Sequence, residues 1–404
     1  MNFYDYYGDG YDVEVLKPRL AKLLNAFRNN EGFDADFLFS SPGRAEILGN
    51  HTDHNHGKVL VASISCDILA AVKKTDGDLI KICSEGYTPI TIDLSDTEIK
   101  PNEKGTSTAL ARGVANALKQ KGLKIGGFTA YLTSSVFKGA GVSSSAAFEV
   151  LVAEIFNSLY LNGELSAVEK AVISQYSENV YFGKPCGLLD QCGIAIGSLC
   201  YLDFKNPTAP TQESFTMPKG YSLVITNTGG DHASLTSHYA QIRIEMEEVA
   251  KVFGKKVLRE VDYQEFLQKI SLVKKSVSDR AILRAMHYYE ENQRVEIACN
   301  ALKNGNVKEF LKAVNDSGLS SLTRLQNCAV PNEVSQPVVL GIELSRSIIK
   351  DGAVRVHGGG FAGSILAIVN DKEKDAYLLK MQEVFGEENV FTAHVRPTGT
   401  AKMV

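Results

Sequence analysis

Residues 41–57 concentrate the side chains that are best suited to bind a small polar ligand. The segment reads SPGRAEILGNHTDHNHG and places arginine, histidine, carboxylate and amide groups between apolar segments. Carboxylate and amide oxygens accept hydrogen bonds from sugar hydroxyls, whereas arginine and histidine side chains donate them. A metal site is the alternative, but the spacing in HTDHNH fits no regular zinc pattern and no cysteine lies nearby. The segment therefore predicts a site for a polyhydroxylated ligand.

Residues 138–150 have the composition of a phosphate-binding loop. They read KGAGVSSSAAFEV and lie where an expected strand ends and an expected helix begins. Glycine allows the backbone to approach a ligand closely, and the start of a helix offers free amide donors and the positive end of its dipole. The GK[ST] ending of a Walker A loop is missing, and the glycines alone would favour a serine-rich helix cap.

Two further segments contain residues that could do chemistry. GKPCGLLDQCGIAIG, at 183–197, contains Asp190, although an isolated aspartate beside glycine and leucine more often belongs to a turn or cap. RVHGGGFAGSILAIV, at 355–369, contains three adjacent glycines, for which a tight hairpin is the simplest explanation. Neither segment by itself decides a function.

Together these segments resemble the signatures of the GHMP kinases, and among them those of the galactokinases. The first resembles PGR-x-N-L-I-G-E-H-T-D-Y-N-x-G, with Glu46, Asn50 and His54 in place of the family's Asn, Glu and Tyr. The second resembles P-x-G-x-G-L-S-S-S-A-A, PCGLLDQ is similar to PCGIMDQ, and the last resembles V-R-M-T-G-G-G-F-G-G. The resemblance implies an enzyme, a phosphotransferase with an alcohol group as acceptor.

The resemblance also implies which residues act on the sugar. Asp190 takes the place of the carboxylate beside the anomeric hydroxyl and would accept its proton as general base. Arg44 would stabilise the developing charge and keep Asp190 ionised. The implied sugar contacts are Glu46, Asn50, His51, Asp53, Gly187 and Tyr239. The implied reaction converts ATP and α-D-galactose to galactose 1-phosphate and ADP.

The same resemblance places ATP and Mg²⁺ at the glycine- and serine-rich loop. The residues that it assigns to the nucleotide are Lys138, Gly139, Ala140, Gly141, Val142, Ser143, Ser144 and Ser145. Ser145 and Glu178 are the implied magnesium ligands, and hard oxygen ligands suit that ion. Taken alone, Glu178 would be an ordinary carboxylate on the surface of a helix.

The departures in the first signature leave the sugar open. Asn50 keeps one acceptor but lacks the negative charge of the family's Glu, so it would tolerate a C6 carboxylate as well as a C6 hydroxyl. Plant galacturonokinases similarly lack that Glu and carry His after the Asp, whereas Glu46 could restore the charge from four residues upstream. We expect a galactokinase, with a galacturonokinase as the alternative. A non-catalytic sugar and ATP sensor is a third interpretation, which the intact SSSAA motif and Asp190 disfavour.

Composition indicates an ordinary globular protein. The chain has 404 residues, is 44% hydrophobic and carries a formal net charge of −4, so nothing suggests a nucleic-acid or membrane partner. Seven cysteines without a CxxC pair indicate reduced thiols. Neither a signal peptide nor an apolar run of roughly 20 residues is visible. We therefore expect a cytoplasmic protein with small-molecule ligands, a monomer in the first instance, with a dimer left open.

The expected elements give an α+β fold, because strands and helices do not alternate regularly enough for one doubly wound sheet. Strands are expected at 37–39, 59–73, 80–83, 88–94, 127–132, 198–204, 221–227, 354–369 (a strand–turn–strand) and 390–396. Helices are expected at 13–28, 107–119, 146–159, 167–180, 238–253, 263–270, 279–304, 307–317, 337–351 and 372–385. The resemblance implies the two-domain GHMP kinase fold. Its ribosomal S5 domain 2-like N-terminal domain would span 1–205 and its ferredoxin-like C-terminal domain 206–404, with the polar stretch 206–218 between them.

Overall fold

The computed structural model describes residues 2–136, 141–230, 235–361 and 363–404. Three residues that the sequence assigns to the nucleotide, Lys138, Gly139 and Ala140, therefore lie outside the described residues. Within the described ranges, no helix has the length and apolar character needed to cross a membrane. All seven cysteines lie in these ranges and each is free, which agrees with the prediction of reduced thiols.

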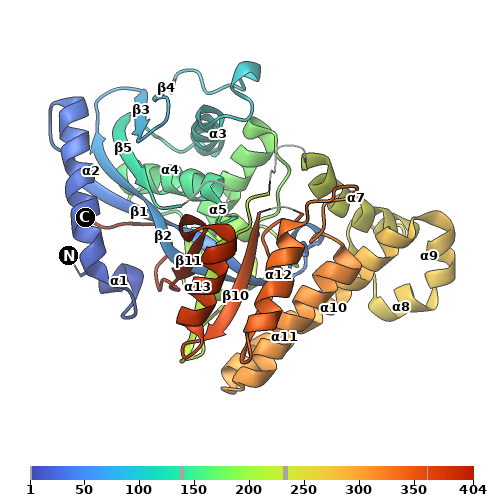
Figure 1. Cartoon of the computed structure of the whole chain (residues 1–404). Helices are drawn as coiled ribbons and strands as arrows, with labels where there is room; N and C mark the ends of the chain where they lie inside the picture. The colour runs from blue at the N-terminus through green and yellow to red at the C-terminus, as the bar shows by residue number, and fades with distance from the viewer. Residues whose placement is uncertain (1, 137–140, 231–234, 362) are drawn as a thin grey trace.

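An eight-stranded sheet organises the N-terminal half (Figure 1). Its order is β12-β1-β2-β5-β3-β4, with β6 paired to β2 and β7 paired to β6. The strands are β1 (Phe37–Leu48), β2 (Lys58–Lys74), β3 (Leu79–Ser84), β4 (Ile90–Asp93), β5 (Phe128–Ser134), β6 (Leu199–Asp203), β7 (Thr211–Phe215) and β12 (Ala401–Lys402). The last of these comes from the far end of the chain, so both termini lie close together beside this sheet (Figure 1).

Helices cover both faces of this sheet. Leu69 and Ala71 of β2 pack with α2 (Leu16–Glu31), whereas Ala70 and Val72 belong to the main core. Successive side chains of a strand point to opposite faces, so the nearly continuous apolar run of β2 needs a helical layer on each side. The helices of the main core are α3 (Ser107–Gln120), α4 (Ser144–Tyr160), α5 (Ala167–Tyr176) and α6 (Leu189–Ile196).

A second sheet of four strands, in the order β11-β8-β10-β9, forms the C-terminal half. It contains β8 (Tyr221–Asn227), β9 (Gly352–His357), β10 (Ser364–Asn370) and β11 (Val390–Ala393). Leu366 and Ile368 of β10 face the main core with α10 (Asp279–Lys303) and α11 (Val307–Ser320). Ile365 and Ala367 face α12 (Pro337–Ile348) and α13 (Lys374–Phe385). Two sheets with separate helical layers confirm the α+β class.

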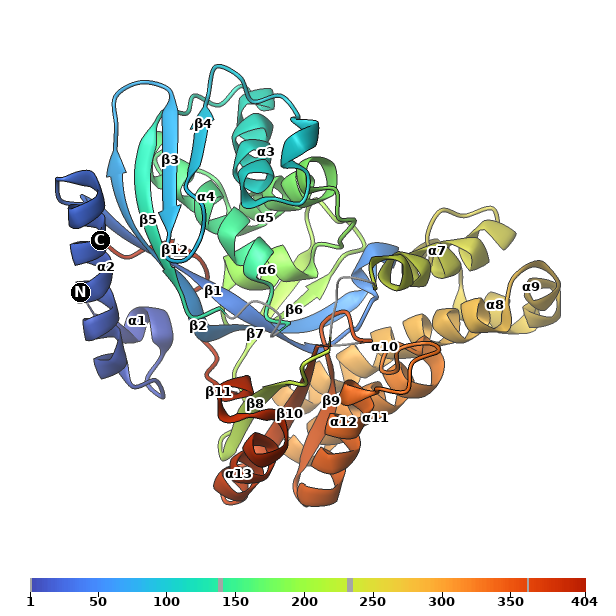
Figure 2. The same cartoon turned by 45° about the horizontal axis from the view of Figure 1, so that its top comes forward.

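A helical extension projects beside the two sheets (Figure 2). It contains α7 (Thr236–Val252), α8 (Tyr263–Gln268), α9 (Ile270–Ser276) and the first part of α10. Ile242, Met246, Phe266 and Tyr288 are fully or almost fully buried in its own apolar core. The extension matters for the site because α7 carries Tyr239 on its first turn.

The connection between the two halves differs from the sequence prediction. Residues 211–215, inside the predicted polar linker 206–218, form β7 and pair with β6 in the first sheet. A turn at 206–210, in which the Asn206 side chain accepts from the amide of Thr208 at 3.3 Å, joins the two strands into a hairpin. The division after residue 205 stays a prediction, and the strand pairing favours a boundary after β7.

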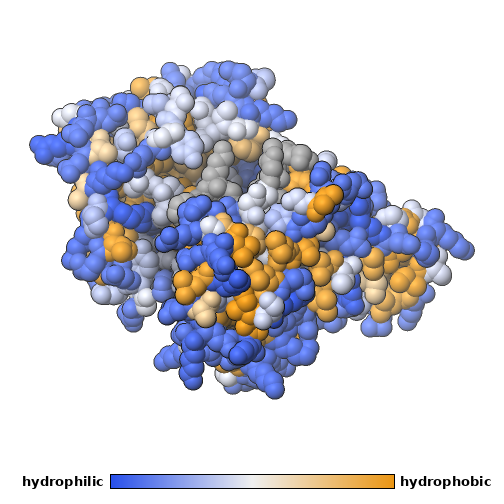
Figure 3. All heavy atoms as spheres, viewed as in Figure 1, coloured by the Kyte–Doolittle hydropathy of each residue, from blue (hydrophilic) through white to orange (hydrophobic). Residues whose placement is uncertain are grey.

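The surface is mostly polar, with an apolar patch on one face (Figure 3). The patch lies over α12 and α13, where Leu340 is 56% and Leu379 70% exposed. Scattered exposed apolar residues are normal on soluble folds, so the patch alone indicates no partner.

Candidate active site

The first signature lies largely within a strand. The sequence predicts a strand over 37–39, but β1 continues to Leu48 and is buried from Phe39 onward. The strand can approach the glycine- and serine-rich loop because residue 43 is glycine. A Cβ on Gly43 would lie 3.0 Å from both the Val142 carbonyl oxygen and the Cys66 sulfur. This close approach brings the side chain that follows, Arg44, to the loop.

Arg44 and Asp190 are in direct contact. Arg44 Nε donates to Asp190 Oδ1 at 2.7 Å, and Arg44 Nη1 donates to the carbonyl of Gly141. Ser143 Oγ donates to the other oxygen of Asp190. Burial alone would raise the pKa of Asp190. Arg44 and Ser143 together lower it by more than burial raises it, so the pKa lies below its usual range. Asp190 is therefore ionised at neutral pH, and its side chain is still 33% exposed to incoming ligands.

Residues 141–145 have the backbone geometry of a phosphate cradle. Gly141 and Ser143 adopt left-handed φ values of 67° and 63°, which turns the chain sharply into α4. In the described part of the chain, no side chain caps the start of α4. The first amide groups of a helix have no intrahelical acceptor, so they are available to an anion. This geometry supports the nucleotide assignment of residues 141–145.

Ser145 and Glu178 lie together, as a shared metal site requires. Ser145 Oγ donates to Glu178 Oε1 at 3.0 Å, and Gln191 Nε2 donates to Glu178 Oε2 at 2.8 Å. Glu178 lies on a π-helical turn (Ser177–Phe182) and is almost fully buried. A hydroxyl, a carboxylate and nucleotide phosphates would supply the oxygen ligands that Mg²⁺ prefers.

The buried carboxyl group of Glu149 bears on whether the site at Ser145 and Glu178 suits a cation. Glu149 on α4 is fully buried, and both of its oxygens lack a hydrogen-bond partner among the described residues. Burial and the charge of Glu178 raise the pKa of Glu149 well above its usual range. Carboxyl groups gathered at such low exposure fit a site that receives a cation. Sequence reasoning missed Glu149, because its helical position looks like ordinary core.

The predicted residues line a cavity of about 400 Å³, a volume suited to a small ligand. The described residues with a predicted role that line it are Arg44, Glu46, His51, Asp53, Gly141, Val142, Ser143, Ser144, Ser145, Gly187, Asp190 and Tyr239. A larger open hollow between α7 and α9 contains none of them. The cavity thus joins the phosphate cradle, the Arg44–Asp190 pair and the expected sugar contacts in one space.

His51, Asp53 and Gly187 form one wall of the cavity. Burial lowers the pKa of His51 to about 4, so the ring is neutral, and its Nε2 lies 3.0 Å from the Gly359 carbonyl oxygen. Asp53 accepts from the backbone amides of Leu189 at 3.1 Å and of His54 at 2.9 Å. A Cβ on residue 187 would overlap the Asp53 carboxyl group, so only glycine fits at this position. This wall offers donors and acceptors to hydroxyl groups.

Tyr239 closes the cavity from α7. Its hydroxyl donates to the Gly360 carbonyl at 2.9 Å, and its ring packs edge-on against Phe361 with centroids 5.5 Å apart. A Cβ on Gly359 would press into the Tyr239 ring, which explains why this segment is rich in glycine. Glycines 358–360 therefore do more than form a hairpin, because they let β9 and its following turn approach Tyr239.

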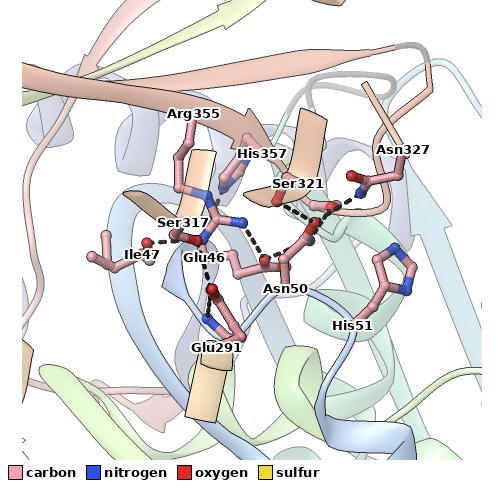
Figure 4. Close-up of polar contacts among 12 residues, drawn as sticks. Glu46, Ile47, Asn50, His51, Glu291, Ser317, Ser321, Asn327, Arg355 and His357 are labelled. Carbon is pink, nitrogen blue, oxygen red and sulfur yellow. Dashed lines mark hydrogen bonds and ion pairs between the residues drawn. The ribbon is translucent and has the colours of Figure 1, made fainter. Parts of the chain in front are cut away.

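Asn50 does not line the cavity, although it lies beside Glu46 and His51, which do (Figure 4). It is fully buried outside the cavity lining. Its Nδ2 donates to Glu46 Oε1 at 2.7 Å and to the Gly358 carbonyl at 2.8 Å. Its Oδ1 accepts from Asn327 Nδ2 at 2.8 Å and from Ser321 Oγ at 3.3 Å. All the hydrogen-bonding groups of the amide are occupied by protein, so a direct sugar contact at Asn50 is not supported.

Glu46, in contrast, lines the cavity. Its Oε1 also accepts from Arg355 Nη2 at 3.1 Å, and Arg355 is fully buried (Figure 4). Burial raises the pKa of Glu46 to about 7, although Arg355, Arg44 and Asn50 act in the opposite direction. Within the described part of the chain, Oε1 accepts both hydrogen bonds to this carboxyl group, which leaves Oε2 for a ligand.

Several residues of the site were not predicted from the sequence motifs. Arg355 begins the last signature, but only the register of β9 brings it to Glu46. His54, Lys184 and Arg243 also line the cavity. Lys184 is adjacent to the PCGLLDQ segment, and its basic side chain so near the predicted catalytic aspartate was a usable signal.

Two family models match separate parts of the chain. The galactokinase galactose-binding signature matches residues 25–74, and the GHMP kinases N terminal domain matches residues 109–198. The first match contains Arg44 and Glu46, and the second contains Glu178 and Asp190. The matched segments therefore include both sides of the cavity.

Solved structures show the same fold. Lactococcus lactis galactokinase complexed with galactose is 26% identical, with a TM-score of 0.83 over 95% of this chain and 100% of that one. The Methanococcus jannaschii mevalonate kinase (16% identity, TM-score 0.62) aligns over 89% of this chain and 98% of its own. A Streptococcus pneumoniae phosphomevalonate kinase in complex with phosphomevalonate and AMPPNP (12%, TM-score 0.59) aligns over 88% and 97%. The last two show the fold alone. The chain therefore carries a galactokinase galactose-binding signature and a GHMP kinase N-terminal domain, is similar to a galactokinase along nearly its whole length, and is a phosphotransferase that acts on an alcohol group.

Proposed function

We propose that the protein transfers the γ-phosphoryl group of ATP to the anomeric hydroxyl of galactose. The observation that carries this proposal is the Arg44–Asp190 pair, which lies in the cavity between the phosphate cradle and the sugar wall. Phosphoryl transfer depends on positioning and charge stabilisation, which a fixed cation and carboxylate supply. The free cysteines support a reducing compartment such as the cytoplasm.

In this proposal each member of the pair has a separate role. Asp190 accepts the C1 hydroxyl proton while the C1 oxygen forms a bond to the γ-phosphorus and the bond to the ADP oxygen breaks. Arg44 stabilises the charge on the transferring group and holds Asp190 in its ionised form. Ser145 and Glu178 would hold Mg²⁺, which supplies charge neutralisation at the phosphates when it is bound.

The lining of the cavity supports a neutral sugar. Glu46 presents a carboxyl oxygen, and Asp53 adds a second acidic side chain to the wall. These groups accept hydrogen bonds from hydroxyls and would repel a hexuronate carboxylate in a water-poor space. The galactose-binding signature and the galactose complex of the Lactococcus lactis enzyme support the same choice. Galacturonate stays the second candidate, because Arg243 also lines the cavity and could pair with a carboxylate.

ADP release from ATP–Mg²⁺ against a panel of sugars and other acceptors tests the proposal. The panel is galactose, galacturonate, glucose, arabinose, N-acetylgalactosamine, homoserine and mevalonate. We expect galactose to give the highest kcat/KM. Galacturonate as the best substrate would overturn the assignment of the sugar and point to Arg243. Binding of galactose and ATP without turnover would overturn the enzymatic proposal and favour a sensor.

A further inference from the structure

Lys184 is a charged residue in the cavity for which the reaction proposed above has no role. It lies between the π-helical turn that carries Glu178 and the helix that carries Asp190, and it lines the cavity together with residues 141–145. Its side chain is 56% exposed, while Glu178 is only 3% exposed. The ammonium group is therefore available to a ligand from the side of the phosphate cradle.

The contacts of Lys184 are much weaker than those of the neighbouring cation. Arg44 is bound to Asp190 at 2.7 Å and to the Gly141 carbonyl. Among the described residues, the Lys184 ammonium has one hydrogen bond, to Glu178 Oε1 at the long distance of 3.4 Å. An ammonium group has three donors, so this contact leaves most of its capacity unused. Burial alone would lower the pKa of Lys184, but Glu178 and Asp190 raise it, so the group is charged at neutral pH.

The partner that Lys184 has among the described residues, Glu178 Oε1, is an oxygen that the proposed metal site also needs. Glu178 Oε1 accepts from Ser145 Oγ at 3.0 Å and faces Lys184 Nζ at 3.4 Å. A divalent cation ligated there would lie beside the ammonium group and repel it. Asp190, whose charge also acts on Lys184, already accepts from Arg44 and Ser143. Phosphate oxygens in the cradle would be the remaining strong acceptors.

We propose that Lys184 is a phosphate-positioning residue: it binds Glu178 while the metal site is free and binds a phosphate oxygen of ATP when the nucleotide occupies the cradle. The inference rests on the proposed function for the identity of the nucleotide. It adds a cation to the part of the cavity lining that includes residues 141–145. It also gives Glu178 two exchangeable partners, the ammonium group and the metal.

Isothermal titration calorimetry of ATP without sugar tests this proposal, first in EDTA and then with saturating Mg²⁺. Lys184→Met should weaken ATP binding by about tenfold or more in EDTA, because it removes a hydrogen bond from a charged group to the phosphate. Lys184→Arg should retain much of the affinity. Lys312→Met is the matched control, because Lys312 pairs with Asp316 at 2.5 Å on α11 and is absent from the cavity lining. Unchanged ATP affinity of Lys184→Met would overturn the proposal.

A double-mutant cycle with Glu178→Gln separates a direct role of Lys184 from a general charge effect. Removing the Glu178 charge frees the ammonium group, so Glu178→Gln should bind ATP several-fold more tightly than the original protein in EDTA. In the Lys184→Met background the same change should give a clearly smaller gain. Equal gains in both backgrounds would contradict the exchange of partners. Because these titrations contain no sugar, they stay interpretable even if the protein fails to phosphorylate galactose.

Discussion

Arg44 and Glu46 lie two residues apart on one strand, yet they belong to regions with opposite character. Arg44 binds Asp190 in an open region, where the carboxylate is still 33% exposed and its pKa is lowered. Glu46 belongs to a closed region with Asn50 and Arg355, in which all three side chains are at least nine-tenths buried. The difference teaches that a polar residue in a signature is a ligand contact only if some of its hydrogen-bonding capacity is left unused.

The two regions also differ in the interactions that set the pKa of their carboxyl groups. Asp190 gains a close ion pair and a hydroxyl donor, and these outweigh its burial. At Glu46 burial outweighs Arg355, so the pKa rises to about 7. We therefore expect changes in the open region to alter rates, and changes at Asn50 and Arg355 in the closed region to alter stability.

Asp190→Asn should give the largest effect and tests the open region. General acid–base catalysis contributes roughly 10²- to 10⁴-fold, so we expect kcat to fall by at least about 10²-fold while the fold is retained. ADP release with galactose measures this loss, and circular dichroism checks the fold. Asp203→Asn is the matched control, because Asp203 pairs with Arg259 at 2.9 Å outside the cavity lining. A kcat within threefold of the original value would remove Asp190 from the reaction.

Arg355→Met should give the largest loss of stability and tests the closed region. Breaking a buried ion pair costs roughly 3–5 kcal/mol, and we expect about 3 kcal/mol because Glu46 can take up a proton. Urea denaturation measures the change in the free energy of unfolding. The double variant Glu46→Gln/Arg355→Met should be more stable than Arg355→Met alone. A loss below about 1 kcal/mol would show that the pair does not stabilise the fold.

Asn50→Asp sharpens the boundary between the two regions. The substituted oxygen would face two acceptors, Glu46 Oε1 and the Gly358 carbonyl, where Nδ2 now donates. An unsatisfied buried group costs about 1–3 kcal/mol, and we expect a destabilisation of that size in urea denaturation. The ratio of kcat/KM for galactose over galacturonate should stay constant. A changed ratio with unchanged stability would place Asn50 in the sugar site after all.

On stability, Glu46→Gln should give the smallest effect, a change in pH dependence, which urea denaturation without sugar measures separately from the sugar contact at this residue. The pKa of Glu46 is raised from 4.5 to about 7 in the folded protein, so the folded state holds its proton more tightly than the unfolded chain. The stabilisation from this proton is complete below about pH 4.5 and is lost as the pH rises to about 7. The original protein should therefore lose stability relative to Glu46→Gln between pH 5 and 7.5 in urea denaturation. A constant difference across this range would contradict the raised pKa.

The sequence was sufficient for the open region because its residues stand in contiguous motifs. Arg44, Asp190 and residues 141–145 meet in one cavity, as the resemblance implies. The closed region was not predictable, because the environment of Asn50 is created by Asn327 and Gly358, far away in the chain. Local pattern cannot show that such distant groups saturate an amide.

The same limit explains the errors in the fold. The polar residues of β7 (Thr211–Phe215) carry little apolar alternation, and only pairing with β6 makes them a strand. The extension of the first strand through the signature depends on its pairing with β2, which continues as far as Leu48. Long apolar elements such as β2 and α4 were predicted nearly to their ends, because their own composition determines them.

Phosphorus and proton NMR of the product formed from ATP, Mg²⁺ and galactose tests the central claim most directly. If Asp190 in the open region activates the C1 hydroxyl, we expect one new phosphate ester, in which the phosphorus is coupled to the anomeric proton of galactose. Asp190→Asn should form it at least about 10²-fold more slowly. A phosphate on another hydroxyl, or ADP release without any sugar phosphate, would contradict the placement of the C1 hydroxyl beside Asp190.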